Sequence, residues 1–244
     1  MKILALDAAF DAVSVAVLAD GAVLSQAQAA GGRGQGEILM PMIKRVMAEA
    51  GVAFAGLDRI AVTIGPGHFT GLRLGLAAAR GLGLAAGKPL DGITTFDAVL
   101  GAVPDDERGP GMAVVAFETK RADLYGQVFA IGLGGFAPAG APGALAPADL
   151  AARIPPGPRL LLVGDGAPRL AAALAGRDFR ISRAPALPHA VWVARIAASR
   201  VPSVRPGLTP SPEPLYLRPP DVTTPRNRTP EWNTPPPDPC LPST

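Results

Sequence analysis

The 244-residue sequence has little of several residue types on which covalent stabilisation or catalysis often depends. Its one cysteine is Cys240, so no disulfide can form within the chain, and a reducing compartment is the natural environment. Its two histidines, His68 and His189, argue against a histidine-rich metal site. No serine or cysteine nucleophile with a histidine and an acid is indicated. Metal-dependent and nucleophilic catalysis by this chain are therefore not favoured.

The sequence also lacks a long apolar run. The longest, residues 74–87, is interrupted by Arg80 and is shorter than the roughly 20 residues that span a bilayer. The chain opens directly on an apolar strand pattern, with no positively charged region or cleavage site of an export signal before it. We expect a cytoplasmic protein with no membrane partner.

The sequence also has no large excess of either positive or negative charge. The formal net charge is +3, and the basic residues are scattered along the chain rather than grouped in a stripe. Because nucleic-acid affinity depends on releasing counterions from several phosphates at once, this chain alone has little capacity for it. We expect any tRNA to be held through a complex with other proteins.

The hydrophobic pattern predicts an α/β fold. Three short strands at 2–7, 13–19 and 22–27 precede an amphipathic helix at 37–50, a buried strand at 59–64, a second helix at 71–87 and a strand at 90–93. Thr95 is placed to cap a following helix that runs to residue 100. Three adjacent strands followed by helix, strand, helix and strand are the order of an RNase H-like lobe.

The second half repeats this opening. Strands at 113–118 and 124–131 form a hairpin that aligns with the first one, and a carboxylate, Asp7 or Glu118, ends the first strand of each. Residues 132–158 predict a loop with at most one short helix. A strand at 160–163 and helices at 168–175 and 189–200 follow. We predict two RNase H-like, actin-like lobes at 1–101 and 102–219, the second one reduced.

A proline-rich tail is predicted at 220–244. Half of the chain's 28 prolines lie beyond residue 201, which argues against a packed core there. Within this region the sequence PLYLR at 214–218 has the hydrophobicity to dock back on the body.

The most specific segment is GPGHFTGLR at 65–73, between a buried strand and a helix. Its glycines permit tight turns, Thr70 is a candidate helix cap, and amides at a helix start can hold an anion. Arg73 opposes the helix dipole there, so an acidic group of this chain, a phosphate or a partner's carboxylate is expected beside it. His68 could be a ligand or, more simply, polar surface. The candidate anion or nucleotide contacts are Asp7, Gly65, Gly67, Thr70, Gly71 and Glu118.

Three strand-end carboxylates, Asp7, Glu118 and Asp165, could converge on a cleft between the lobes and hold Mg²⁺. However, the turn after Asp7 lacks the glycine of an actin-like phosphate loop, and no adenosine-binding segment is evident. We therefore assign no metal ligands, no catalytic residues and no cofactor to this chain alone.

The two long helices are the candidate partner surface. Small residues at 75, 79, 83 and 87 form a smooth ridge, and three of the five methionines lie on the neighbouring helix. The ridge could equally pack on its own sheet. The predicted interface residues are Leu39, Met40, Ile43, Met47, Leu72, Arg73, Gly75, Leu76, Ala79, Arg80 and Gly83.

These motifs together resemble the TsaB (YeaZ) family of tRNA threonylcarbamoyladenosine biosynthesis proteins. The segments LALDAAFDAVSVAV, RGQGEILMPMI and GPGHFTGLRLGLAAARGL are similar to its opening hairpin, first helix and most characteristic segment. FETKRADLYGQVF, VGDGA and PLYLR follow in the family's order, so that the resemblance covers about residues 1–219. Gln35, His68 and Glu118 depart from the usual histidine, serine and aspartate.

The resemblance implies an actin-like, non-catalytic subunit that heterodimerises with the catalytic subunit TsaD and acts with the ATPase TsaE. In the family, ATP and metal belong to those partners, and the helices that match 37–50 and 71–87 form the shared bundle. The same surface could form a homodimer when the partner is absent.

Two other classes of function stay open. One is an enzyme, either an actin-like phosphotransferase or a glycoprotease-type enzyme. Tight binding of Mg·ATP by the isolated chain, abolished by Asp7→Asn in a calorimetric titration, would favour the phosphotransferase. Direct tRNA binding through Arg73, Arg80 and the basic residues at 226–228 would show a steep dependence on salt.

Overall fold

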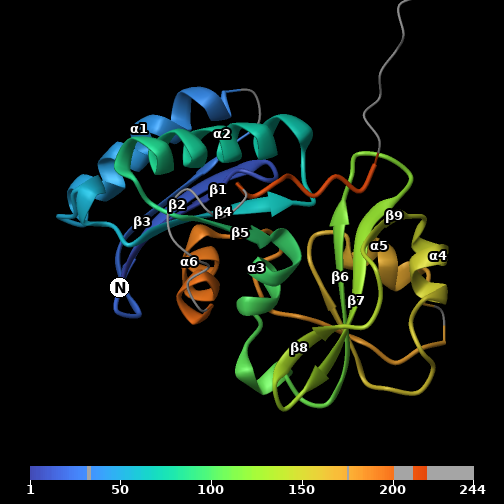
Figure 1. Ribbon diagram of the computed structural model, residues 1–244. Coiled ribbons are helices and arrows are strands. Elements are labelled where there is room, and N and C mark those ends of the chain that lie inside the picture. The colour runs from blue at the N-terminus through green and yellow to red at the C-terminus, as the bar shows by residue number, and fades with distance from the viewer. Residues whose placement is uncertain (32–33, 175, 201–210, 219–244) are drawn as a thin grey trace, which may run out of the picture.

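The computed structural model describes residues 1–31, 34–174, 176–200 and 211–218, and Figure 1 shows their arrangement. The predicted tail at 220–244, Cys240 and the basic residues at 226–228 lie outside the described residues.

The first half of the chain forms a five-stranded mixed sheet in the order β3-β2-β1-β4-β5. β1 pairs antiparallel with β2 and parallel with β4, and β5 adds parallel to β4. β1 and β2 are almost entirely buried, because helices cover both faces of the sheet at its centre. The strands are β1 (Lys2–Asp7), β2 (Ala12–Ala19), β3 (Ala22–Ala30), β4 (Arg59–Gly65) and β5 (Leu90–Thr94).

The second sheet repeats this order. β6 pairs antiparallel with β7 and parallel with β10, β11 adds parallel to β10, and β8 and β9 both pair with β7. The α/β fold of two RNase H-like lobes is therefore confirmed, including the alignment of the two hairpins. The strands are β6 (Gly111–Glu118), β7 (Leu124–Gly132), β8 (Gly135–Pro138), β9 (Gly143–Leu145), β10 (Leu160–Val163) and β11 (Arg180–Ile181).

Helices of very different length cover the two sheets. α1 (Gln35–Glu49) and α2 (Phe69–Ala86) lie side by side on one face of the first sheet, and α3 (Thr95–Gly101) and α6 (Ala190–Ser199) lie on the other face (Figure 1). Among the described residues, the outer face of the second sheet is covered by two short helices, α4 (Pro147–Ala152) and α5 (Ala167–Ala172), of six residues each. The second lobe is reduced, as predicted.

The lobes share a core at their junction. Phe96 of α3 packs against Phe117 and Phe129 of the second sheet, with ring centroids 5.7 and 6.3 Å apart. Phe10, from the turn after β1, contacts Phe117 as well, at 4.7 Å. Because these large rings are buried between the two sheets, the junction is an apolar contact rather than a hinge of polar surface.

The predicted lobe boundary separates the two sheets but not the whole chain. α6 follows the second sheet in sequence, yet it packs on β1, β2 and α3 of the first lobe. His189 caps this helix, because its Nδ1 accepts a hydrogen bond from the Val191 amide at 3.1 Å. The chain therefore returns to the first lobe before the described part ends.

Some local predictions were wrong. Thr94, not Thr95, caps α3, by accepting a hydrogen bond from the Asp97 amide at 3.0 Å. The region 132–158, predicted to be mostly loop, contains β8 and β9 as well as α4, because turns rich in glycine and proline there connect short strands that pair with β7. Two 3₁₀ turns, η1 (Phe54–Gly56) and η2 (Asp105–Glu107), complete the described elements. No helix in the described residues is both long and apolar enough to cross a membrane.

Candidate functional site

Asp7 lies at the end of β1, where an actin-like protein would place a phosphate-binding turn. Its side chain is 1% exposed and accepts hydrogen bonds from Thr63 Oγ1 at 2.7 Å and from the Ala9 amide at 3.2 Å. Burial raises the pKa of Asp7 to about 7, against the opposing effect of these two hydrogen bonds. Asp7 is thus sealed inside the first lobe rather than presented to a ligand.

The glycine-rich loop at 65–71 docks on the turn that follows Asp7. The His68 amide donates a hydrogen bond to the Ala9 carbonyl at 2.6 Å. A Cβ atom at Gly67 or Gly71 would lie far inside van der Waals contact with the Ala9 or Ala8 carbonyl oxygen. These two glycines are therefore required for a close backbone approach. Both also line the cleft described below, so their predicted role as anion contacts stays a prediction.

Two more of the predicted anion contacts, Gly65 and Thr70, differ in their surroundings. Gly65 has a φ of +116° and packs against Leu215, so that its surroundings are filled by the chain itself. Thr70 does not cap the helix, because α2 begins at Phe69 with His68 in the cap position. Thr70 is exposed and lines the cleft described below.

Replacing Gly71 by alanine is expected to destabilise the protein by about 1–3 kcal/mol, the usual cost of forcing an extra methyl group into a packed site. Gly81 offers a matched control in the same helix, since a Cβ there meets nothing within 4 Å. Gly81→Ala is expected to stabilise by about 0.5–1 kcal/mol, because glycine in a helix interior carries an entropic cost. Urea unfolding of both variants checks this, and equal effects would contradict it.

Asp7, Glu118 and Asp165 do not converge. Glu118 Oε2 lies 3.2 Å from Arg169 Nη1, and Asp165 Oδ1 accepts a hydrogen bond from the Glu118 amide at 3.0 Å. None of the three lines the cleft described below. Within the described ranges, no group of three His, Cys, Asp or Glu side chains is arranged to hold a metal ion. The predicted meeting of these three carboxylates in a cleft between the lobes is wrong, because Asp7 and Glu118 are each engaged within their own lobe, while Asp165 interacts with His68 of the first lobe.

Most of the predicted interface residues are core residues. They point from α1 and α2 into the sheet beneath, where an amphipathic helix buries its apolar face. Their assignment to a partner interface is wrong for this reason. The residues so buried are Leu39, Ile43, Met47, Leu72, Gly75, Leu76, Ala79 and Gly83.

Three predicted interface residues do lie on the surface: Met40, Arg73 and Arg80. Met40 is 47% exposed on α1. Both arginines contact the segment 211–218, which we call the strap. Arg80 donates to Ser211 Oγ at 2.9 Å and to the Pro212 carbonyl at 2.6 Å.

The strap docks on the body, as the hydrophobicity of PLYLR predicted. Its Leu215 amide donates to the Ile64 carbonyl at the end of β4, at 2.7 Å. Tyr216 stacks on Phe69 with ring centroids 5.4 Å apart, and its hydroxyl accepts a hydrogen bond from Arg73 Nε at 3.0 Å. Arg73 also lies 3.7 Å from the centroid of the Phe69 ring. Its predicted neighbour was an acidic group or phosphate, and the structure instead supplies an aromatic ring and a phenol.

The strap continues to the second lobe. Arg218 forms an ion pair with Asp123, donates to Thr119 Oγ1 at 3.3 Å and lies over the Tyr125 ring at 5.5 Å from its centroid. Asp123 and Tyr125 belong to the β6–β7 hairpin region of the second lobe. The strap therefore connects the outer side of α2 with the second sheet.

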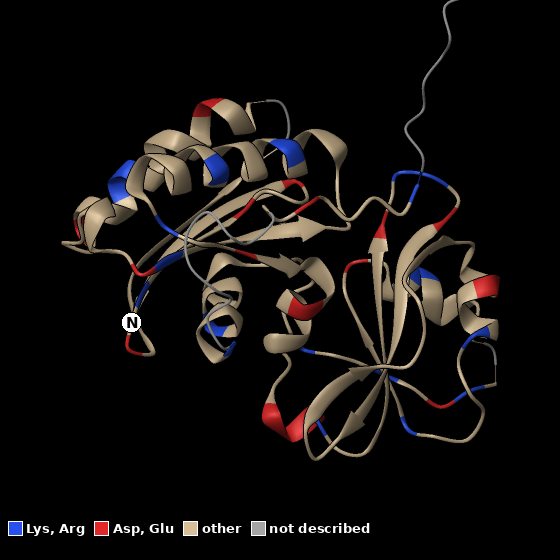
Figure 2. Ribbon diagram, in the orientation of Figure 1, with Lys and Arg blue, Asp and Glu red and all other residues tan. Residues whose placement is uncertain are grey.

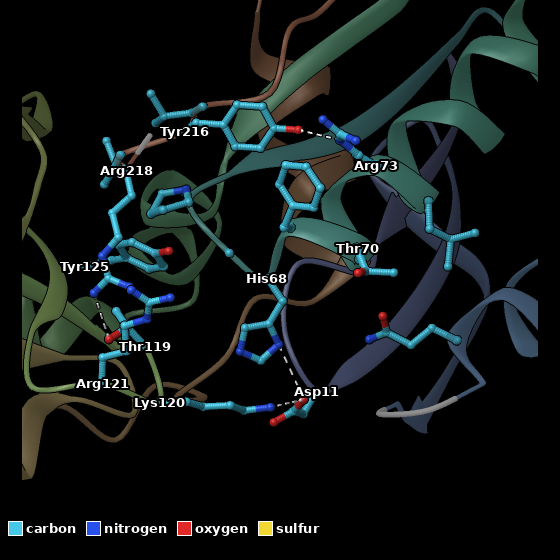
Figure 3. Close-up of a pocket in the computed structure, with 18 of the residues that line it drawn as sticks. Asp11, His68, Thr70, Arg73, Thr119, Lys120, Arg121, Tyr125, Tyr216 and Arg218 are labelled. Carbon is cyan, nitrogen blue, oxygen red and sulfur yellow. Dashed lines mark hydrogen bonds and ion pairs between the residues drawn. The ribbon is translucent and has the colours of Figure 1, made fainter. Parts of the chain in front are cut away.

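A cleft of about 980 Å³ lies beneath the strap, between the start of α2 and the β6–β7 turn (Figure 3). Asp11, from the β1–β2 turn, lies at its lower edge and pairs with two groups. Lys120 Nζ is 3.2 Å and His68 Nδ1 is 3.4 Å from Asp11 Oδ1. Burial and the Lys120 ammonium lower the pKa of His68, so the imidazole is neutral at pH 7 and its contact with Asp11 is no ion pair.

Sequence reasoning missed the second-lobe side of this cleft. Lys120, Arg121 and Tyr125 line it together with Arg218 of the strap. The adjacent Lys120 and Arg121 in a predicted hairpin turn were the available signal. Gln35 is 9% exposed and donates from Nε2 to the Phe10 carbonyl at 2.6 Å. It positions the turn after β1 at the edge of the cleft.

Known proteins resemble this chain in both sequence and structure. The family model "TsaD: tRNA N6-adenosine threonylcarbamoyltransferase" matches residues 23–182. The Escherichia coli (strain K12) tRNA threonylcarbamoyladenosine biosynthesis protein TsaB is 36% identical over 96 residues, which cover 39% of this chain and 41% of that protein. The structure of YeaZ from Pseudomonas aeruginosa superposes with a TM-score of 0.67 and 26% identity over 81% of this chain and 92% of that one. The chain belongs to the TsaB (YeaZ) family.

Two further relatives match nearly the whole chain. An uncharacterized protein of Mycobacterium tuberculosis (strain ATCC 25618 / H37Rv) is 32% identical over 222 residues, which cover 90% of this TsaB-family chain and 93% of the relative. A second Pseudomonas aeruginosa structure, of a protein with similarity to peptidase YEAZ, has a TM-score of 0.70 and 27% identity over 89% of this chain and 99% of that one. The family fold therefore accounts for both lobes of this chain.

Proposed function

We propose that this TsaB-family chain is a non-catalytic subunit in the biosynthesis of tRNA threonylcarbamoyladenosine. It heterodimerises with a TsaD-type catalytic subunit and acts with a TsaE-type ATPase, and those partners supply ATP and metal. The observation that supports the proposal is that the outer face of the α1–α2 pair is exposed. Since the inner face is buried on the first sheet, the outer face is the part of these helices open to a partner.

The outer face of α2 carries an apolar stripe beside two arginines, Arg73 and Arg80, which contact the strap; Figure 2 shows basic positions along this helix pair. Ala77, Gly81 and Leu84 are exposed at helical spacing, and Leu84 is 87% exposed. Met40 of α1 adds flexible apolar surface on the same side of the sheet. Small side chains allow close approach of another helix, and exposed large apolar ones gain most from being covered. We place the partner interface on this outer face rather than on the ridge of Gly75 and Ala79.

The buried state of Asp7 supports the non-catalytic part of the proposal. A carboxylate that binds a nucleotide-bound metal must reach the ligand, and Asp7 is instead hydrogen-bonded inside the lobe. Glu118, its counterpart in the second lobe, lies beside Arg169. Neither feature favours the phosphotransferase alternative, and no feature of the described residues favours a glycoprotease.

The double substitution Gly81→Glu with Leu84→Glu is expected to abolish copurification of the TsaD-type subunit, because it places two carboxylates in the centre of the apolar face. Circular dichroism and the melting temperature should stay close to those of the wild-type chain, since both positions are exposed. The same variant should be monomeric if the isolated chain uses this face for an isologous dimer.

Leu133→Glu with Gly134→Glu is the matched control. This pair of residues makes the same change of size and charge in the exposed β7–β8 turn, where Leu133 is fully exposed and a Cβ at Gly134 meets nothing within 4 Å. Copurification should survive in the control. Retained copurification in the helix variant would refute the interface, and ATP turnover by the isolated wild-type chain would refute the non-catalytic role.

A further inference from the structure

The cleft beneath the strap concentrates positive charge that is dispersed along the sequence. Its lining includes four cationic side chains and one carboxylate, Asp11. Arg73 comes from α2, Lys120 and Arg121 from the β6–β7 turn, and Arg218 from the strap, so that three separate segments contribute (Figure 3). A polyanion that enters the cleft can approach all four within one binding site.

Several of these cations are held in place by neighbours that an anion need not displace. Arg73 is fixed by the Phe69 ring and the Tyr216 hydroxyl, two uncharged groups that leave its positive charge uncompensated. Lys120 and Arg218 each have a carboxylate neighbour, Asp11 and Asp123. The Lys120 ammonium has three donor positions, and one contact with Asp11 does not use all of them.

Aromatic rings lie among the cations. Tyr216 is 41% exposed and rests on Phe69, so one face of its ring is supported by the protein. Tyr125 is half-buried in the opposite wall, with Arg218 over its ring. Rings that alternate with cations are the arrangement that binds nucleic-acid single strands, because bases stack on the rings while phosphates meet the charges.

We infer that this cleft binds a single-stranded segment of RNA, with phosphates against Arg73, Lys120, Arg121 and Arg218 and a base against Tyr216 or Tyr125. The inference rests on the proposed function for its choice of RNA among polyanions. It gives this chain a direct contact with the tRNA substrate, separate from the helix face that binds the partner subunit. Few phosphates fit in a cleft of about 980 Å³, so the affinity of the chain alone is modest.

The test is fluorescence anisotropy of a labelled single-stranded RNA oligonucleotide with the isolated full chain, at several salt concentrations. Lys120→Glu with Arg121→Glu is expected to weaken binding about tenfold or more and to reduce the salt slope by about 1.4, the value for two lost phosphate contacts on a single strand. Tyr125→Leu is expected to weaken binding roughly fivefold or more with an unchanged slope, because it removes stacking and no charge.

Arg180→Glu with Arg195→Glu is the matched control, since it makes the same change of net charge at exposed positions on β11 and α6, neither of which lines the cleft. It should change the affinity much less than the cleft variant. The inference is overturned if wild-type chain shows no binding, if the control weakens binding as much as the cleft variant, or if polyglutamate competes as well as RNA. Equal competition by AMP at the same nucleotide concentration would show a mononucleotide site and overturn the assignment to a strand.

This experiment is independent of the partner interface. Copurification with the TsaD-type subunit uses the outer face of α1 and α2, and RNA binding uses the cleft of the isolated chain. If RNA binding is not observed while copurification is intact, only the RNA site is refuted.

Discussion

Arg59→Met is expected to lower the free energy of unfolding by about 3–5 kcal/mol, the usual cost of removing one partner from a buried ion pair. Arg59 is 3% exposed on β4, and its Nη1 lies 2.9 Å from Asp91 Oδ2 on β5. The same nitrogen donates to the Ala197 carbonyl of α6 at 3.1 Å. Methionine fills much of the volume but leaves both the carboxylate and the carbonyl without this donor. Guanidinium-induced unfolding measures the difference.

The exposed pair Arg45 and Glu49 on α1 is the control. These side chains are more than half exposed, their N–O distance is 3.7 Å, and Arg45→Met should change stability by no more than about 0.5 kcal/mol. Adding Asp91→Asn to Arg59→Met should recover part of the loss, because a neutral amide then stands where the carboxylate had lost its arginine partner. A loss for Arg59→Met as small as that of the control would contradict the assignment.

Asp7→Asn is expected to raise the free energy of unfolding at pH 8 by a few kcal/mol, on the order of 4. The pKa of Asp7 is about 7 in the folded chain and near 3.8 in the unfolded one. Between these values unfolding releases a proton, so wild-type stability falls as the pH rises from about 4 to about 7 and stays lowered above it. Asparagine is neutral at every pH in this range and mimics the protonated acid. The free energy of unfolding of the variant therefore does not fall for this reason as the pH rises.

The pH profile separates this cause from a change in packing. Below about pH 4 Asp7 is protonated in both states, and the two proteins should differ little in stability. Urea unfolding at pH 4, 6 and 8 should therefore show a gap that widens with pH. A gap independent of pH would mean that the charge of Asp7 is not its origin.

The duplicated architecture followed from local signals. Two hairpins with strand-end acids, each followed by alternating helices and strands, were visible in the pattern, because alternation and helical periodicity are properties of neighbouring residues. The glycine-rich segment at 65–73 is also evident in the sequence, but the structural role of its glycines is not. Gly67 and Gly71 leave room for the backbone at Ala8 and Ala9, about 60 residues earlier in the chain, and no local signal shows such an approach.

The α1–α2 helix pair has a property that local sequence patterns do not determine, namely which surface covers its apolar residues. Leu39, Leu76 and Ala79 are apolar at helical spacing, which predicts that they are covered but not by what. The structure places them on the chain's own sheet and leaves Gly81 and Leu84 outside. Long-range contacts decide between the two outcomes, since burial on a sheet and burial on a partner favour the same side chains.

By itself the sequence determined the α/β class, the repeat of two RNase H-like lobes and the family, because these depend on periodicity and on motifs within short stretches. Only the tertiary structure decided which face of α1 and α2 is free, that α6 and the strap return to the first lobe, and that Arg73, Lys120, Arg121 and Arg218 line one cleft. The reason is physical: charge and burial at a site are sums over residues that folding brings together from distant parts of the chain.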